Sequence, residues 1–144
     1  LSVMVAGNYN FGTVPIAGST VTVTGITVTN AGNVGQNYTV NCTTTTPGGS
    51  PWSAGETAAY DIFVIQSTFH NTQPAVKQFG NEEIVYSSNT VCGSAVYSVD
   101  GTQTGAAVPA NGQRTMWHLL KMPLFTSTTW QQRISVNITA SDSE

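Results

Sequence analysis

The stretch Arg133-Ile134-Ser135-Val136-Asn137-Ile138-Thr139-Ala140 decides the fold class. Its apolar residues alternate strictly with polar ones, which is typical of a β-strand with one face buried and the other in solvent. A helix would instead repeat its apolar residues every three or four positions, and that spacing is nearly absent from the chain. The stretch therefore predicts a strand over residues 133–140.

Similar alternating runs occur along much of the 144-residue chain. They predict further strands over residues 1–5, 20–24, 26–28, 38–43, 60–65, 96–99 and 114–122. Gly25 lies where the apolar phase slips between two runs, which is typical of a β-bulge. Turn clusters rich in Gly, Pro, Asn and Asp separate the runs. We therefore expect an all-β fold: a single antiparallel β-sandwich domain over residues 1–144, immunoglobulin-like or jelly-roll, with seven to nine strands.

The low charge of the chain excludes several classes of function. Only 8% of its residues are charged, with four basic residues and a formal net charge of −3, against roughly 25% charged residues in typical soluble domains. Four cations cannot neutralise a phosphate backbone, so nucleic-acid binding is excluded. No apolar run reaches the roughly 18 residues of a spanning helix, so we expect no membrane span in the mature chain.

The polarity of the chain comes from Thr, Ser and Asn rather than from Lys and Glu, which is unusual for a cytosolic protein. The chain also begins at Leu1 rather than at a methionine, as it would after removal of a signal peptide. We therefore expect an extracellular or cell-surface location.

The chain has two cysteines, Cys42 and Cys92. In a secreted protein an even count predicts one disulfide, and closing this loop would stabilise the fold by roughly 4 kcal/mol. The alternative is a pair of buried free thiols. On the strand alternation Cys42 faces the core together with Tyr38 and Val40. No C-x-x-C pair or neighbouring histidine is present, so we expect no metal at these cysteines.

Three N-x-[ST] sequons occur, at Asn37, Asn41 and Asn137. Each asparagine alternates with core-facing residues, so the strand pattern predicts that all three point to solvent. Chance sequons are expected in a chain so rich in Asn and Thr. In a host that N-glycosylates, these three positions would carry N-linked glycans.

The sequence offers little material for catalysis. His70 and His118 are its only histidines, and neither has a partner at metal-binding spacing. There is no calcium loop of alternating acids and no G-x-S-x-G nucleophile elbow. We therefore expect no enzyme, no catalytic or metal-binding residue and no cofactor. His118 alternates with Met116 and Leu120, which favours a hydrogen-bonded histidine inside the fold.

Aromatic residues keep a second class of function open. Trp52, Trp117 and Trp130, together with several tyrosines, could form a stacking face for sugars. Trp117 and Trp130 belong to neighbouring predicted strands, where such residues usually form core or cross-strand pairs. A secreted carbohydrate- or surface-binding module is therefore the alternative to a structural role.

The N-terminal quarter of the chain resembles a known family. The stretch Asn10-Phe11-Gly12-Thr13-Val14-Pro15, then Gly18-Ser19-Thr20 and Thr27-Val28-Thr29-Asn30-Ala31-Gly32-Asn33, resembles the opening of abnormal-spindle/hydin-type immunoglobulin-like domains. Bacterial surface proteins carry many of these domains. The resemblance covers about residues 8–40 and implies an immunoglobulin-like sandwich in which Phe11 anchors the first strand. It implies little about function, because function resides in sites rather than in folds.

The chain has almost none of the lysines, prolines and inward charges that usually prevent strand pairing at sheet edges. We therefore expect a structural subunit of an extracellular filament, pilus or surface layer whose partners are copies of itself. Leu1, Val3 and Val5 form an apolar stripe, and Gly7 follows it. Residues 1–7 are thus a candidate donor strand for a groove in the next subunit, a contact that builds a filament. The alternatives are that residues 1–6 form the first strand of their own sheet, or that the protein is a jelly-roll virion coat protein.

Overall fold

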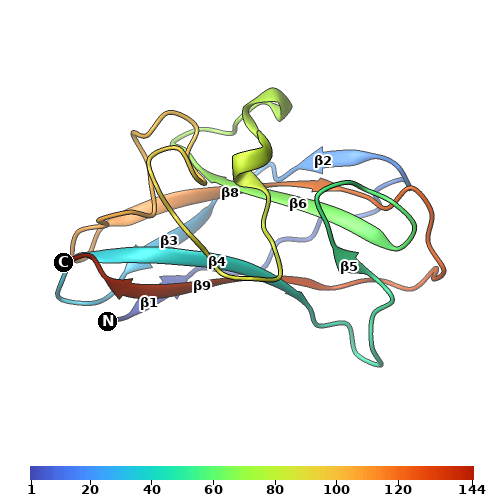
Figure 1. Ribbon diagram of the computed structural model, residues 1–144, viewed down its shortest axis with the longest axis horizontal. Helices are drawn as coiled ribbons and strands as arrows, with labels where there is room; N and C mark the ends of the chain where they lie inside the picture. Colours follow the sequence, from blue (N-terminus) through green and yellow to red (C-terminus); the bar gives the residue numbers. More distant parts are fainter.

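Nine strands in two sheets make up the computed structural model, which describes residues 1–144 (Figure 1). The first sheet has the order β1-β3-β8-β6-β5, and β2 pairs with the second half of β8. Its strands are β1 (Val3–Val5), β2 (Ser19–Val21), β3 (Ile26–Asn30), β5 (Ser53–Ala54), β6 (Ile62–Phe69) and β8 (Gln113–Lys121).

The second sheet has the order β7-β4-β9. Its strands are β4 (Gln36–Thr44), β7 (Thr90–Val91) and β9 (Ile134–Asp142). Every strand pair in the molecule is antiparallel except the short parallel pair of β5 with β6. The predicted all-β class, with mainly antiparallel sheets, is therefore confirmed.

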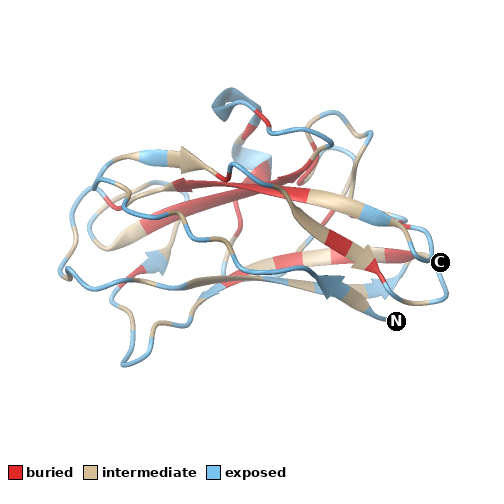
Figure 2. Ribbon diagram, turned by 180° about the vertical axis from the view of Figure 1, so that it is seen from behind, coloured by how far each residue is buried: buried red, intermediate tan, exposed pale blue.

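The core lies between the two sheets and is built from the inward-facing residues of their central strands. Tyr38 and Val40 of β4 meet Phe63 and Phe69 of β6 in one buried cluster. Figure 2 shows the buried residues concentrated along these strands. Cys42 is buried in the same row of β4, as the alternation predicted.

A segment between β6 and β8 covers the outer face of the first sheet. It contains two short 3-10 helices, η1 (Val76–Gln78) and η2 (Asn81–Glu83). Phe79 packs on Trp117 and Leu119 of β8. The Gln66 side chain donates hydrogen bonds from its Nε2 to the carbonyl oxygens of Phe79 (3.0 Å) and Gly80 (2.6 Å).

No helix has the length and apolar character needed to cross a membrane.

The expected bulge lies between β2 and β3. Val21 is opposite Leu119 and Ile26 is opposite Met116. The four residues between Val21 and Ile26 therefore face only the two residues between Met116 and Leu119 on β8. A Cβ at Gly25 would overlap the Thr115 side chain, which explains why glycine occupies the bulge.

Three predicted strands differ from the structure. The strand predicted over residues 20–24 ends at Val21, and Val23 in the following bulge is 71% exposed. Residues 96–99 form only an isolated bridge between Ser98 and Phe69, because Tyr97 has a left-handed backbone (φ 59°) that breaks the extended run. The strand predicted over residues 60–65 begins only at Ile62, because Asp61 also has a positive φ (54°). The strand continues to Phe69, and the polar residues Gln66, Ser67 and Thr68 of this extension are buried.

The segment that carries the family resemblance is also less regular than expected. Phe11 lies outside any strand, in the connection from β1 to β2. Its ring contacts Tyr9 edge-on at a centroid distance of 4.8 Å and packs against the core. Phe11 therefore anchors a loop rather than a first strand.

The two termini lie at the same end of the molecule (Figure 1). Val3 pairs with Asn30 and Gln36 pairs with Asp142, so both termini flank the turn that joins β3 to β4. The connections from β4 to β5 and from β8 to β9 lie at the opposite end (Figure 1).

Candidate functional site

β9 is a long edge strand with one side unpaired. Its nine residues pair along their whole length with β4, and no other strand pairs with them. Hydrogen bonds run from Ser143 N to Gly35 O (3.3 Å) and from Thr45 N to Arg133 O (3.0 Å). They show that the odd-numbered residues of β9 form the main-chain hydrogen bonds with β4. The alternate residues of β9 therefore direct their main-chain N–H and C=O groups away from β4. In the apolar part of β9 these residues are Ile134, Val136, Ile138 and Ala140; Asp142 continues the series at the end of the strand.

The same four residues form an incompletely buried inner row. Their side chains pack against the core but stay partly exposed. On the neighbouring β4, by contrast, Tyr38, Val40 and Cys42 are at most 1% exposed. The core is therefore less well covered along β9 than along β4. Apolar side chains from an added strand would find contacts there.

The N-terminal segment pairs within its own chain. Val3 is opposite Asn30 and Val5 is opposite Val28, so β1 is an edge strand of the first sheet. Val3 packs against the core, whereas Leu1 remains 65% exposed and Val5 44% exposed. β1 also lies beside β9 (Figure 1). In this structure the N-terminal strand therefore belongs to its own sheet, which was the alternative to strand donation. Exchange of residues 1–7 between copies stays a prediction.

The two cysteines are free thiols, which corrects the predicted disulfide. Cys92 N donates to Tyr38 O (2.9 Å), whereas Cys42 lies four residues farther along β4 and donates its N–H to Tyr86 O (2.8 Å). Four strand residues span about 13 Å, and a disulfide needs Cα atoms within about 7 Å. Burial raises the pKa of Cys42 to about 11 and that of Cys92 to about 12, so neither forms a reactive thiolate at neutral pH.

The three sequon asparagines lie on the outer face of the second sheet, in agreement with their predicted direction. Asn41 and Asn137 are directly opposite each other, and Asn137 Nδ2 donates to Asn41 Oδ1 (2.9 Å). Asn41 Nδ2 donates in turn to Asn89 Oδ1 (2.5 Å). Asn37 lies farther along, opposite Ser141. Asn41 and Asn137 therefore form one cross-strand pair on this outer face. Glycosylation itself stays a prediction.

His118 is buried in the core, and its Nδ1 lies 2.7 Å from Ser67 Oγ. Burial lowers its pKa to about 4, so the ring is neutral at physiological pH. The prediction of a hydrogen-bonded internal histidine is confirmed. His70 lies near the surface, with its Nε2 at 3.7 Å from Asp100 Oδ2. No group of three or more His, Cys, Asp or Glu side chains is placed to hold a metal ion.

The three tryptophans do not form one stacking face. Trp52 and Trp117 are buried, and their indole N–H groups donate to Thr126 Oγ1 (2.8 Å) and His70 O (2.9 Å). Trp130 is not in a strand beside Trp117 but in the loop before β9, where it is 77% exposed. The predicted pairing of Trp117 with Trp130 is therefore wrong.

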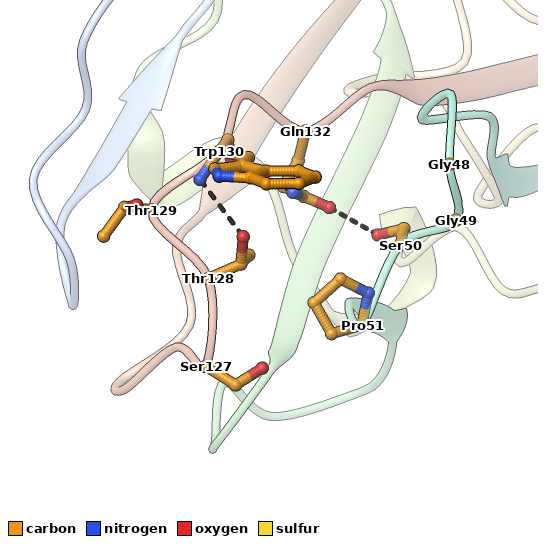
Figure 3. A pocket seen from close by; sticks show the side chains of 9 residues that line it. All are labelled: Gly48, Gly49, Ser50, Pro51, Ser127, Thr128, Thr129, Trp130 and Gln132. Atoms are coloured by element: carbon orange, nitrogen blue, oxygen red, sulfur yellow. Dashed lines mark hydrogen bonds between the residues drawn. The ribbon is translucent and has the colours of Figure 1, made fainter.

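Trp130 borders an open hollow of about 670 Å³ at the end of the molecule opposite the termini. Figure 3 shows its indole on one side of the hollow, between two loops. The remaining lining residues are Gly48, Gly49, Ser50, Pro51, Ser127, Thr128, Thr129 and Gln132. Ser50 Oγ donates to Gln132 Oε1 (2.5 Å) and joins the two loops. None of the lining side chains is ionisable.

Sequence reasoning missed this hollow, although a signal was present. The run of hydroxyl residues from Thr126 to Thr129 interrupts the alternation and ends immediately before Trp130. Such a run predicts a loop, and a tryptophan that follows directly is a candidate for exposure.

No family model, curated protein or solved structure matches this chain. Its function must therefore be argued from the chemistry of its own surfaces.

Proposed function

We propose that this protein is a structural subunit of an extracellular filament, pilus or surface layer, and that its copies join by β-strand addition at the free edge of β9. The observation that carries the proposal is the nine-residue edge strand with an incompletely buried apolar row. Edge strands of monomeric proteins are usually short or protected by Lys, Pro or bulges. β9 is long, regular and free of Lys and Pro, and its one charged residue, Asp142, is its last.

The strand order supports an immunoglobulin-like assignment of the sandwich. β1, β3, β8 and β6 take the places of strands A, B, E and D, and β4 and β9 take those of C and F. The resemblance of residues 8–40 to abnormal-spindle/hydin-type domains supports the same assignment. In an immunoglobulin domain strand G pairs with the outer edge of F. Among residues 1–144 no strand does so, and in our proposal a second copy supplies it.

Residues 1–7 of a neighbouring copy are the proposed donor. Leu1, Val3 and Val5 alternate with the same period as the inner row of β9. Residues 1–7 have no charged side chain, and β9 has only Asp142 at its end. Burying a Val or Leu side chain contributes about 1.5–3 kcal/mol. The donor's present pairing with β3 covers Val3–Val5 and is flanked by hydrogen bonds from Ala31 N to Ser2 O (2.8 Å) and from Ala6 N to Thr27 O (2.9 Å). Pairing with β9 of the next copy would replace these main-chain hydrogen bonds with equivalent ones. A head-to-tail contact of this kind does not close and therefore builds a filament.

The surface composition supports an extracellular structural role without catalysis or a cofactor. The outer face of β4 and β9 presents Asn, Thr and Ser side chains, including the three sequons. In a glycosylating host this face would carry N-linked glycans. Uncharged strands also repel each other little, which favours association between copies.

A lysine on β9 tests the proposal. Thr139→Lys places a charge on the exposed face of the edge strand, whereas Thr43→Lys places the same charge on the same face of the inner strand β4. Electron microscopy and light scattering should show filaments or layers for the native protein and for T43K, and folded monomers for T139K. A native protein that stays monomeric, forms closed two-fold dimers or forms closed shells would contradict the proposal.

Deletion of residues 1–7 tests the donor separately. Because β1 is a short edge strand, the shortened protein should stay folded but remain monomeric. A synthetic peptide of residues 1–7 should also shorten filaments of the native protein by occupying the β9 edge. Filaments that still form after the deletion would assign the donor role to another segment.

A further inference from the structure

We propose that the hollow beside Trp130 binds a neutral sugar residue, with the indole of Trp130 as its stacking platform. This site is separate from the β9 edge and lies at the end of the molecule away from both termini (Figure 1). It gives the subunit a binding function in addition to assembly.

The backbone that carries the exposed Trp130 indole is held in place. The backbone N–H of Trp130 donates to Thr128 Oγ1 (3.1 Å), and its carbonyl oxygen accepts from Gln132 Nε2 (3.0 Å). Farther back, the buried Trp52 donates its indole N–H to Thr126 Oγ1 (2.8 Å) and ties this loop to the core. A loop ordered before binding loses little backbone entropy when a ligand arrives.

The loop is also fixed at its start. Asp61 accepts hydrogen bonds from Ser127 N (2.8 Å) and Ser127 Oγ (2.5 Å). These hydrogen bonds hold the pKa of the Asp61 carboxyl below its usual range, so the carboxylate stays ionised and the contact persists at neutral pH. The hydrogen bond from Ser50 Oγ to Gln132 Oε1 joins the two walls of the hollow to each other (Figure 3).

The chemistry of the lining matches a sugar better than other ligands. A pyranose ring presents one face of C–H groups, which stacks on an aromatic ring, and a rim of hydroxyls, which needs uncharged hydrogen-bonding groups. The hollow provides one indole and a rim of Ser, Thr and Gln side chains. The absence of cations in the lining gives phosphate and carboxylate ligands no partner. An apolar peptide anchor would require an apolar pocket, which this lining lacks.

The glycines opposite the indole leave room for the ligand. A Cβ at Gly48 or Gly49 would meet no atom within 4 Å, so the space above both is open. The volume of about 670 Å³ lies within the range of small-ligand sites, roughly 300–1,000 Å³.

Titration of the three indole N–H signals in a ¹⁵N-correlated NMR spectrum of the monomeric T139K variant tests the inference. The probes are cellohexaose, xylohexaose, mannohexaose and chitohexaose at millimolar concentration. At least one of these four sugars should shift the Trp130 indole signal, while the signals of the buried Trp52 and Trp117 indoles stay in place. Trp130→Ala should weaken binding at least tenfold. Phe125→Ala removes another exposed aromatic at the same end, outside the lining, and should leave the affinity within twofold.

Several results would overturn the inference. They are no shift of the Trp130 signal with any of the four sugars, equal affinity of W130A, or a shift given by apolar peptides and by none of the sugars. T139K keeps the hollow intact, because its substitution lies on β9 and outside the lining. Sugar binding by this variant separates the site from assembly, so a failure of either proposal leaves the other standing.

Discussion

Acidification should destabilise the fold through His118. This histidine is buried against Ser67, and burial lowers its pKa to about 4, whereas an unfolded histidine has a pKa near 6.5. As the pH falls from 6.5 to 4, the unfolded chain binds a proton that the folded protein does not accept. The stability contributed by the neutral ring is therefore complete above pH 6.5 and is lost between pH 6.5 and pH 4. At about 1.4 kcal/mol per pH unit, the loss amounts to about 3 kcal/mol.

Glu83 opposes this effect in the native protein. Burial, with Glu82 nearby, raises its pKa to about 7, so the folded state favours the protonated acid. Its contribution is present below its ordinary pKa near 4.5 and is lost as the pH rises toward 7. The two groups thus offset each other between pH 4.5 and 6.5. Glu83→Gln removes the second titration while keeping a side-chain oxygen for the Gly80 N–H that Glu83 accepts at 2.7 Å.

Urea unfolding of E83Q followed by tryptophan fluorescence measures the effect. The free energy of unfolding should fall by about 3 kcal/mol between pH 6.5 and pH 4. In the E83Q/H118N double variant, whose asparagine keeps a polar atom near Ser67, most of this slope should vanish. An E83Q protein with pH-independent stability, or a double variant that retains the slope, would refute the role of His118.

Three further predictions concern buried groups and sequons. Tyr38→Phe should leave the free energy of unfolding in urea unchanged or raise it by about 1 kcal/mol, because the buried Tyr38 hydroxyl has no partner. Tyr97→Phe should instead cost about 1 kcal/mol, since the Tyr97 hydroxyl donates to Ile84 O (3.0 Å). Both cysteines should resist iodoacetamide in the folded protein and each take up one alkyl group in denaturant without reductant; uptake only after reduction would show a disulfide. Glycopeptide mapping of protein from a glycosylating host should find at least one of Asn37, Asn41 and Asn137 modified, because all three lie on the outer face of the second sheet; material unmodified at all three would contradict the glycan prediction.

The sequence was most informative where local pattern alone determines structure. The alternation over residues 133–140 predicted β9, and the phase slip at Gly25 predicted the bulge, because both depend on neighbouring residues only. The inward direction of Cys42 followed from the same alternation.

The features that the sequence did not predict depend on distance through space or on individual backbone angles. The number of cysteines carries no information on the distance between them in space. Cys92 pairs with Tyr38, and Cys42 lies four residues farther along β4, too far away for a disulfide. The left-handed backbone of Tyr97 ended an apparently regular strand. The hollow beside Trp130 combines loops that are far apart in the sequence, so only the fold brings its walls together.

The most direct test of assembly through β9 is hydrogen–deuterium exchange at its individual amides. The N–H groups of Val136, Ile138 and Ala140 point away from β4, whereas those of Asn137 and Thr139 point toward it. In the T139K monomer the first three should exchange quickly and the amide of Asn137 slowly. In the native assembly all of them should exchange slowly, because an added strand accepts the outward N–H groups. Fast exchange of the Val136, Ile138 and Ala140 amides in assembled material would contradict strand addition at this edge.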